Sequence, residues 1–156
     1  MSEVRWLDDR EQLAWRGFVS MHSRLLSRLE RRLQRETGLS GADYAVLVSL
    51  SESPEGSRRA FELGAEVDWE KSRLSHHLRR MADRGLVERH TCDTDGRGAV
   101  ILITDAGREA IEKAAPYHAE EVRRWFIDLL TPEQLQALTQ ISQAVTERLT
   151  ADDPGP

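Results

Sequence analysis

The chain has 156 residues, of which 39% are hydrophobic and 31% charged, and its formal net charge is -5. This length can bury one sizeable core, or one small domain joined to an oligomerisation element, and it argues against two independent domains. The apolar runs are far shorter than the roughly 20 residues of a membrane-spanning helix, and the charged N-terminus has no signal-peptide core, so we expect a soluble cytoplasmic protein without membrane partners.

Residues that could support catalysis or metal binding are not clustered in the sequence. Cys92 is the single cysteine, which excludes internal disulfides and a zinc site built from cysteines. His22, His90 and His118 are scattered, and there is no glycine-rich phosphate loop or nucleophile motif. We therefore expect neither an enzyme nor a bound cofactor or metal.

The acidic charge is unevenly distributed. Residues 104–156 hold 5 basic and 10 acidic residues, whereas residues 71–80 hold four basic residues and no acidic one. Exposed charges act over about 8 Å in physiological salt, so an acidic chain can still present a locally basic surface. Nearly all the positive charge is Arg, whose planar guanidinium suits phosphate and guanine.

Two helices are predicted in the first third of the chain. Residues 9–36 form a long helix that ends at Thr37-Gly38. Its stripe of arginines is interpreted as a solvated face rather than a phosphate-binding one. A second helix begins at Ser40, where Asp43 stands at the third helical position of a capping box, and it breaks at residues 53–56.

A helix-turn-helix is predicted next, with a short helix over residues 59–67, a turn at 67–69 and a cationic helix that ends at Gly85. Leu74, Leu78 and Met81 recur at helical spacing and form the packed face. The residues predicted to bind DNA are on the opposite face: Lys71, Ser72, Arg73, Ser75, His76 and Arg80.

Two strands, residues 86–91 and 99–103, are predicted to form a two-stranded wing around a turn rich in Asp and Gly. Arg97 lies between glycines and suits a phosphate or minor-groove contact. Asp95 is interpreted as orienting an Arg, because phosphates repel a carboxylate.

The remaining residues predict further helices. Thr104 caps the first of them, and Pro116 is expected to kink or break it. A last helix follows the "TPEQ" cap at residues 131–134 and runs to about Thr150. Its near-heptad apolar positions, and the aromatic residues at both ends of the chain, are more than a small domain can cover. Dimerisation is the simplest explanation, although these helices could instead pack on their own domain.

The predicted fold class is mainly α with a small β-wing. We divide the chain into an N-terminal dimerisation helix (1–38), a winged helix-turn-helix (39–103), C-terminal dimerisation helices (104–150) and a disordered tail (151–156).

Two stretches resemble the MarR family of bacterial winged helix-turn-helix regulators. "SRLSHHLRRMADRGLVER" is similar to the recognition helix and the start of the wing, and "DGRGAVILITDAG" is similar to the wing and the following helix start. The resemblance covers nearly the whole chain. It implies a homodimer that binds pseudo-palindromic operators in double-stranded DNA, often as a repressor, and that releases DNA when a small, often phenolic, effector binds.

The resemblance also bears on single residues. Asp95 and Arg97 match the Asp and Arg of the family's wing, and Ser75 takes the place of a base-facing Thr. Arg73 and His76 stand where a small hydroxyl residue and an Arg are common. The operator sequence therefore cannot be transferred from the family.

Several residues have alternative interpretations. Arg73 is the first choice for a base contact, with a phosphate contact or a surface salt bridge equally open. One of His76 and His77 is expected to face DNA and the other to pack, and protonation of either could alter affinity. Cys92 could be a redox switch if it is exposed.

A mixed aromatic and polar ligand pocket is conceivable, although the same residues could be core. Its candidate residues are Trp15, His22, Tyr44 and Tyr117. The leading functional hypothesis is a homodimeric, ligand-responsive transcriptional repressor. The alternative is a winged-helix regulator that has lost DNA affinity and acts through a protein partner.

Overall fold

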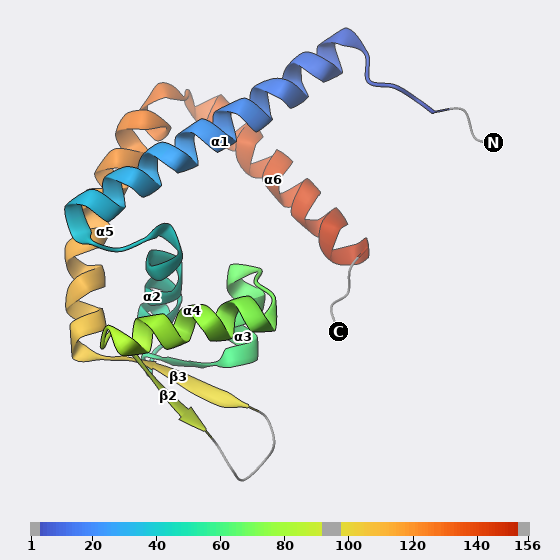
Figure 1. Ribbon diagram of the computed structural model, residues 1–156. Coiled ribbons are helices and arrows are strands. Elements are labelled where there is room, and N and C mark those ends of the chain that lie inside the picture. The colour runs from blue at the N-terminus through green and yellow to red at the C-terminus, as the bar shows by residue number, and fades with distance from the viewer. Residues whose placement is uncertain (1–3, 92–97, 153–156) are drawn as a thin grey trace. The chain divides into compact units, whose positions relative to one another are not determined.

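The computed structural model describes residues 4–91 and 98–152 of the chain (Figure 1). The chain divides into two compact units, Met1–His118 and Ala119–Pro156. The fold is mainly helical with one small sheet, which confirms the predicted fold class. None of the described helices combines the length and the apolar character needed to cross a bilayer.

The ends of the first two helices are fixed by local capping. Helix α1 (Asp9–Thr37) ends at Gly38, whose φ of 74° is the left-handed conformation that glycine adopts without strain. Helix α2 (Gly41–Glu52) starts at Ser40, which forms a reciprocal capping box with Asp43. Both boundaries confirm the predictions from the sequence.

Helices α3 (Ala60–Val67) and α4 (Lys71–Asp83) form the predicted helix-turn-helix. Asp68 turns the chain between them in a left-handed conformation, with a φ of 54°, and the Trp69 amide donates to the Gly64 carbonyl at 3.0 Å. The backbone conformation of Asp68 and the backbone hydrogen bond of Trp69 thus fix these two residues just before the start of α4.

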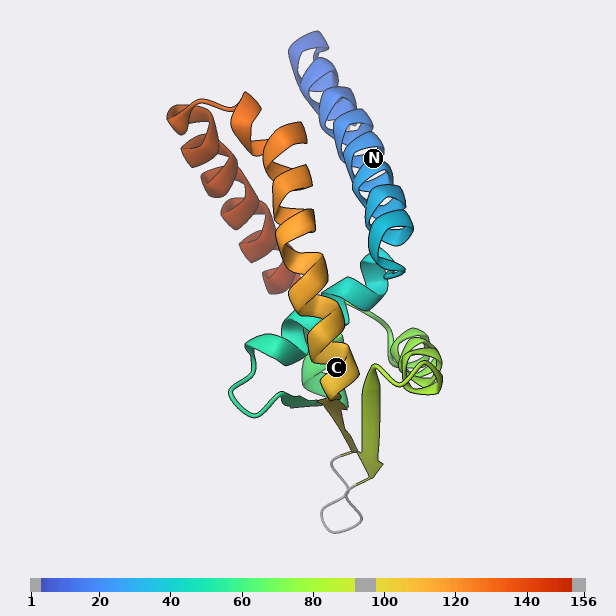
Figure 2. The ribbon, with the colours of Figure 1, turned by 90° about the vertical axis from the view of Figure 1, so that its left-hand side faces the viewer.

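The sheet has three antiparallel strands in the order β1-β3-β2: β1 (Ser57–Arg59), β3 (Ala99–Ile103) and β2 (Val87–Thr91). The predicted two-stranded wing is therefore incomplete. The sequence of β1, Ser-Arg-Arg, has no apolar alternation, and it becomes a strand only because β3 offers a free edge, with Arg58 opposite Ile101. In both ribbon views, α4 lies beside β2 (Figure 2).

The core of the first unit lies where α2, α3 and α4 meet β3. Its fully buried side chains are Leu33, Val46, Leu47, Leu50, Leu63, Met81 and Ile101. Leu74 and Leu78 of α4 are almost as buried, so the predicted packed face of the cationic helix is confirmed. This packing fixes which side of α4 faces outward.

Helix α5 (Asp105–Trp125) begins after Thr104, whose hydroxyl accepts from the Gly107 amide at 3.0 Å. It continues through Pro116, so of the expected kink or break the break does not occur. A proline removes one helical hydrogen bond at a cost of roughly 3 kcal/mol, and a helix of 21 residues has regular turns on both sides to offset this.

The second unit, taken by itself, contains the end of α5, a short 3-10 turn η1 (Ile127–Leu129) and helix α6 (Pro132–Asp152). Thr131 and Gln134 form the predicted cap, with hydrogen bonds of 2.9 and 3.2 Å. The predicted tail is corrected at its start, because residues 151 and 152 are helical. Residues 153–156 lie outside the described part of the chain.

Gly107 offers a test of how closely α5 packs on the sheet. A Cβ at this position would collide with the Leu86 carbonyl oxygen and lie 2.9 Å from the Ile103 side chain. We expect Gly107→Ala to lower the free energy of unfolding by about 1 to 3 kcal/mol in urea denaturation. Gly41→Ala is the matched control, because its Cβ would meet only ordinary contacts with Glu30. Equal stability of the two variants would contradict this packing.

Candidate nucleic-acid interface

Helix α4 is amphipathic, with mainly apolar side chains on its buried side and polar or charged ones on its exposed side. Leu74, His77, Leu78 and Met81 are buried, and Ser75 is half-buried. Between residues 71 and 80 the outward side is exposed and carries four cations and no carboxylate; its residues are Lys71, Ser72, Arg73, His76, Arg79 and Arg80. Of the six residues of this helix that the sequence predicts to bind DNA, five are therefore exposed together. Of the two adjacent histidines, His76 faces solvent and His77 packs, as expected.

Arg73 is not a free surface side chain. Its guanidinium carbon lies 4.4 Å from the centroid of the Trp69 ring, which is a cation–π stacking distance. Trp69 in turn meets the His77 ring edge-on, with ring centroids 5.3 Å apart and an interplanar angle of 83°. Trp69, in the turn of the helix-turn-helix, thus stacks against Arg73, the residue that we consider first for a base contact.

Ser75 has a partner that sequence reasoning missed. Arg89 of β2 donates from Nη1 to the Ser75 hydroxyl at 3.3 Å. Arg89 is exposed and adds a further positive group next to α4. The strand pattern could not reveal this, because the contact depends on the packing of β2 against α4.

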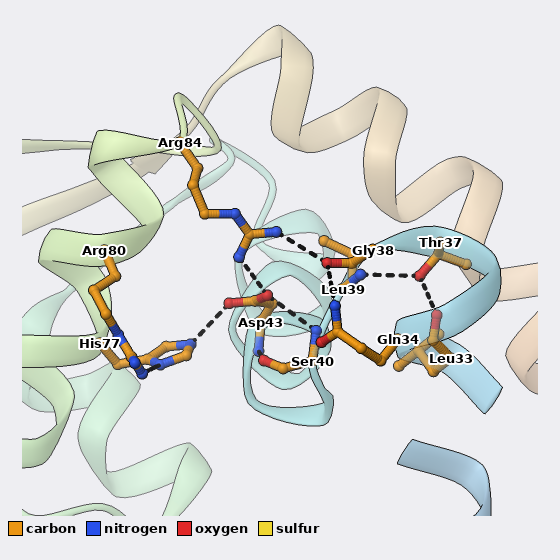
Figure 3. A network of polar contacts seen from close by, with 10 residues as sticks. All are labelled: Leu33, Gln34, Thr37, Gly38, Leu39, Ser40, Asp43, His77, Arg80 and Arg84. Atoms are coloured by element: carbon orange, nitrogen blue, oxygen red, sulfur yellow. Dashed lines mark hydrogen bonds and ion pairs between the residues drawn. The ribbon is translucent and has the colours of Figure 1, made fainter. Parts of the chain in front are cut away.

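The Asp43 carboxylate is the centre of a buried polar network (Figure 3). The residue is only 2% exposed, yet one side chain of α4 and the side chain of the residue that caps this helix converge on it. Arg84 donates from Nη1 to Oδ2 at 2.6 Å, and His77 Nε2 lies 3.0 Å from Oδ1. Oδ2 also accepts from the Ser40 amide at 3.0 Å as part of the capping box. One carboxylate therefore caps α2 and holds α4.

Arg84 extends this network to the end of α1. Its Nη2 donates to the Gly38 carbonyl at 3.1 Å, and Gln34 donates to the same oxygen at 3.0 Å (Figure 3). The cap of α1, the start of α2 and the end of α4 thus share one set of hydrogen bonds. Sequence reasoning recognised Asp43 only as a cap. Its helical spacing to the apolar Val46 and Leu47 was the available indication that it faces the core.

The protonation states within this network follow from burial and neighbouring charges. Burial by itself would raise the pKa of Asp43, but the hydrogen bonds from Arg84 and the Ser40 amide, together with the positive charge, hold this pKa below its usual 3.8. Burial lowers the pKa of His77 below its usual 6.5; the Asp43 charge opposes the shift and Arg80 adds to it. An ionised Asp43 therefore faces a neutral His77 at neutral pH.

Comparison with known proteins places the chain in a family. A model of the MarR family matches residues 37–98. The crystal structure of AbsC, a MarR family transcriptional regulator from Streptomyces coelicolor, is 40% identical with a TM-score of 0.90, covering 95% of this chain and 99% of AbsC. The chain belongs to the MarR family. The resemblance noted in the sequence is thereby confirmed.

Two further relatives are transcriptional regulators, and one of them, Sco3205, is of the MarR family. Sco3205 from the same organism, crystallised in complex with DNA, is 40% identical with a TM-score of 0.90, covering 96% of this chain and 93% of Sco3205. The transcriptional repressor IacR of Pseudomonas putida is 27% identical over 140 residues, which are 90% of this chain and 81% of IacR. The chain is a MarR-family transcriptional regulator.

The tip of the MarR wing lies outside the described residues. Cys92, Asp95 and Arg97 belong to it, so their predicted roles stay predictions. The strands that carry the tip pair with each other, with Thr91 opposite Ala99 at its base. Within residues 4–91 and 98–152, no group of three or more His, Cys, Asp or Glu is arranged to hold a metal ion.

The four candidate ligand residues fall into separate surroundings. Trp15 and His22 flank Phe18 on α1, with ring centroids 5.9 and 5.8 Å from it. Tyr44 packs on His118, and their ring centroids are 4.5 Å apart. Tyr117 lines a hollow of about 330 Å³ with Glu36, Thr37, Ala110 and Lys113. The described contacts do not join Trp15 and His22 to this hollow, and a ligand-binding role for the four residues stays a prediction.

The network makes folding stability depend on pH. The pKa of His77 is lower in the folded chain than its usual 6.5, so the unfolded chain binds more protons below this pH and stability falls on acidification. The pKa of Asp43 is also lower in the folded chain than its usual 3.8, so protonation of this carboxylate likewise reduces stability as the pH falls below 3.8. We expect the free energy of unfolding in urea to decrease from about pH 7.5 to 5.5, by at most about 1.4 kcal/mol per pH unit for each proton.

The variant His77→Phe isolates the contribution of His77. Burial also lowers the pKa of His118. The contribution of His118 to the pH dependence of stability is therefore retained in this variant. We expect a shallower decrease than in the wild type. Identical slopes for the two proteins would contradict a neutral, buried His77.

Proposed function

We propose that this chain is a homodimeric DNA-binding regulator that represses transcription and is released from its operator by a small ligand. The observation that carries the proposal is the outward face of α4, where Lys71, Arg73, Arg79 and Arg80 are exposed and where residues 71–80 contain no acidic residue. Such a face suits the major groove, where Arg reads guanine and Lys or Arg neutralise phosphates.

The relatives support DNA binding and repression. Sco3205, at 40% identity, was crystallised in complex with DNA. IacR and MprA, at 27% and 24% identity, are named transcriptional repressors. We propose that Arg97 of the wing contacts the backbone beside the helix and that Asp95 orients an Arg there.

Exposed apolar side chains support a homodimer. The first unit exposes Trp6, Leu13, Trp15 and Phe18 at or near the start of α1, and the second unit exposes Ile141, Val145 and Leu149 along α6. Large apolar surfaces of this kind mark interaction sites. A two-fold dimer would pair two copies of α4 with the two halves of a pseudo-palindromic operator.

The hollow beside Tyr117 supports a ligand response. It lies between the end of α1 and α5, and the Tyr117 hydroxyl has no hydrogen-bond partner among the described residues. The end of α1 is the same element that Arg84 ties to α4. Footprinting on the DNA that flanks its own gene, with and without small phenolic acids, tests operator binding and release together.

The role of Arg73 is tested by substitution. We expect Arg73→Ala to weaken operator binding about 10-fold to 100-fold in fluorescence anisotropy, and to relax one base position if the contact is direct. Arg10→Ala, which removes an exposed Arg of α1, is the control for net charge and is expected to bind like the wild type. Equal affinity of Arg73→Ala and wild type would refute the assignment.

The salt dependence of wild-type affinity tests the proposed function itself. The logarithm of the affinity is expected to fall linearly with the logarithm of the salt concentration, with a slope set by the number of phosphates neutralised. A flat response would overturn DNA binding and favour the alternative, a regulator that acts through a protein partner.

The dimer is tested on α1. We expect Phe18→Glu to give a monomer in sedimentation equilibrium, because a carboxylate would be buried in an apolar interface. Ser27→Glu adds the same charge to an exposed position of the same helix and should remain dimeric. A dimeric Phe18→Glu protein would exclude this part of α1 from the interface.

A further inference from the structure

His77 is the one buried residue of α4 that carries a polar ring, and its surroundings link the core to the outward face. It is 7% exposed. Asp43 lies on its Nε2 side at 3.0 Å, and the exposed Arg80 lies on its Nδ1 side, with Nη2 at 3.0 Å. The ring therefore stands between a buried carboxylate and a cation that is expected to contact DNA.

The partners determine where the ring proton lies. Arg is always protonated and can only donate, so Nδ1 must accept from Arg80 and cannot carry a proton. The neutral ring then has its proton on Nε2, which faces the acceptor Asp43. Nε2 lies 3.0 Å from Asp43 Oδ1 as an ion-pair contact and has no hydrogen-bond partner among the described residues. The groups that face the ring are thus Asp43 of α2, Arg80 of α4, Arg84 at the cap of α4, and the Trp69 ring.

The same ring also supports Arg73. Trp69 meets His77 edge-on at 5.3 Å, and Arg73 stacks on Trp69 at 4.4 Å. A free Arg side chain loses considerable rotational freedom when it binds, and a side chain held in advance loses less. Arg80 uses one of its five N–H donors on His77, which leaves the others for phosphate or base.

We propose that His77 is a positioning residue for DNA recognition, which holds Arg80 by a hydrogen bond to Nδ1 and Arg73 through the Trp69 ring before DNA binds. The proposal rests on the proposed function, because it assigns these two arginines to the operator. His77 itself does not touch DNA; it acts through the two side chains that do.

Three substitutions separate the two sides of the ring. His77→Asn places an amide oxygen near the position of Nδ1 and keeps the acceptor for Arg80. His77→Gln places an amide nitrogen near the position of Nε2 and keeps the donor to Asp43. His77→Phe keeps a ring against Trp69 but removes both polar contacts. We expect operator affinity to fall about threefold to tenfold in His77→Phe and His77→Gln, and less in His77→Asn.

A double-mutant cycle with Arg80→Ala tests whether His77 acts through Arg80. We expect His77→Phe combined with Arg80→Ala to bind no more weakly than Arg80→Ala alone, because the hydrogen bond is already absent. A merely structural role for His77 would make the two losses multiply. Multiplied losses, or a His77→Phe protein that binds like the wild type while Arg80→Ala binds weakly, would overturn the proposal. Thermal unfolding of each variant identifies proteins that have lost the fold.

A spectroscopic measurement on the wild type keeps the proposal testable if His77 variants do not fold. Long-range ¹H–¹⁵N correlation spectra distinguish the two neutral tautomers of histidine. We expect the proton of His77 on Nε2 near neutral pH, and a proton on Nδ1 would overturn the proposal. A wild-type protein that does not bind DNA would refute the proposed function and this inference together, whereas operator binding with multiplied losses would refute the inference alone.

Discussion

The buried Asp43 carboxylate is the constraint on which the arrangement of the DNA-binding region depends. An ionised carboxylate that is 2% exposed is strongly destabilising unless it is paired and hydrogen-bonded. Here it is satisfied by Arg84, by the Ser40 amide and by its contact with His77. His77 belongs to α4 and Arg84 caps its C-terminal end, so the stability of the buried carboxylate depends on the position of that helix.

The apolar packing of α4 and its polar anchoring have different effects. Leu74, Leu78 and Met81 bury the helix against the core and supply most of the stabilisation, but apolar contacts are not directional. The Arg84 hydrogen bond is directional, and together with the His77 contact it limits the rotation of the helix about its axis and its sliding along it. Since the exposed cations lie on the same helix, their placement is fixed from inside the protein.

The features that sequence predicted well are those that local chemistry determines. Gly38 and the Ser40 capping box set the limits of α1 and α2, and helical spacing separated the buried from the exposed side of α4. The family and the fold class followed from these elements in their order. The roles of single DNA-binding residues remain predictions.

The features that sequence missed depend on contacts between distant residues. Strand β1 exists because β3 pairs with it, and Arg89 meets Ser75 only once β2 packs on α4. Arg84 lies 41 residues from Asp43, and no local pattern links the two. The ligand pocket stays a prediction for the same reason, since the positions of aromatic residues along a sequence do not show which of them come into contact.

The shared use of Asp43 has an evolutionary consequence. A change at position 43 would leave Arg84 without its acceptor and His77 without its anchor, while a change at 77 or 84 would leave the carboxylate undersatisfied. The three positions are therefore expected to be exchanged together in homologues, as a set. The exposed residues of α4 make no contact with the Asp43 carboxylate and are free of this constraint. DNA preference can therefore change while Asp43, His77 and Arg84 stay unchanged.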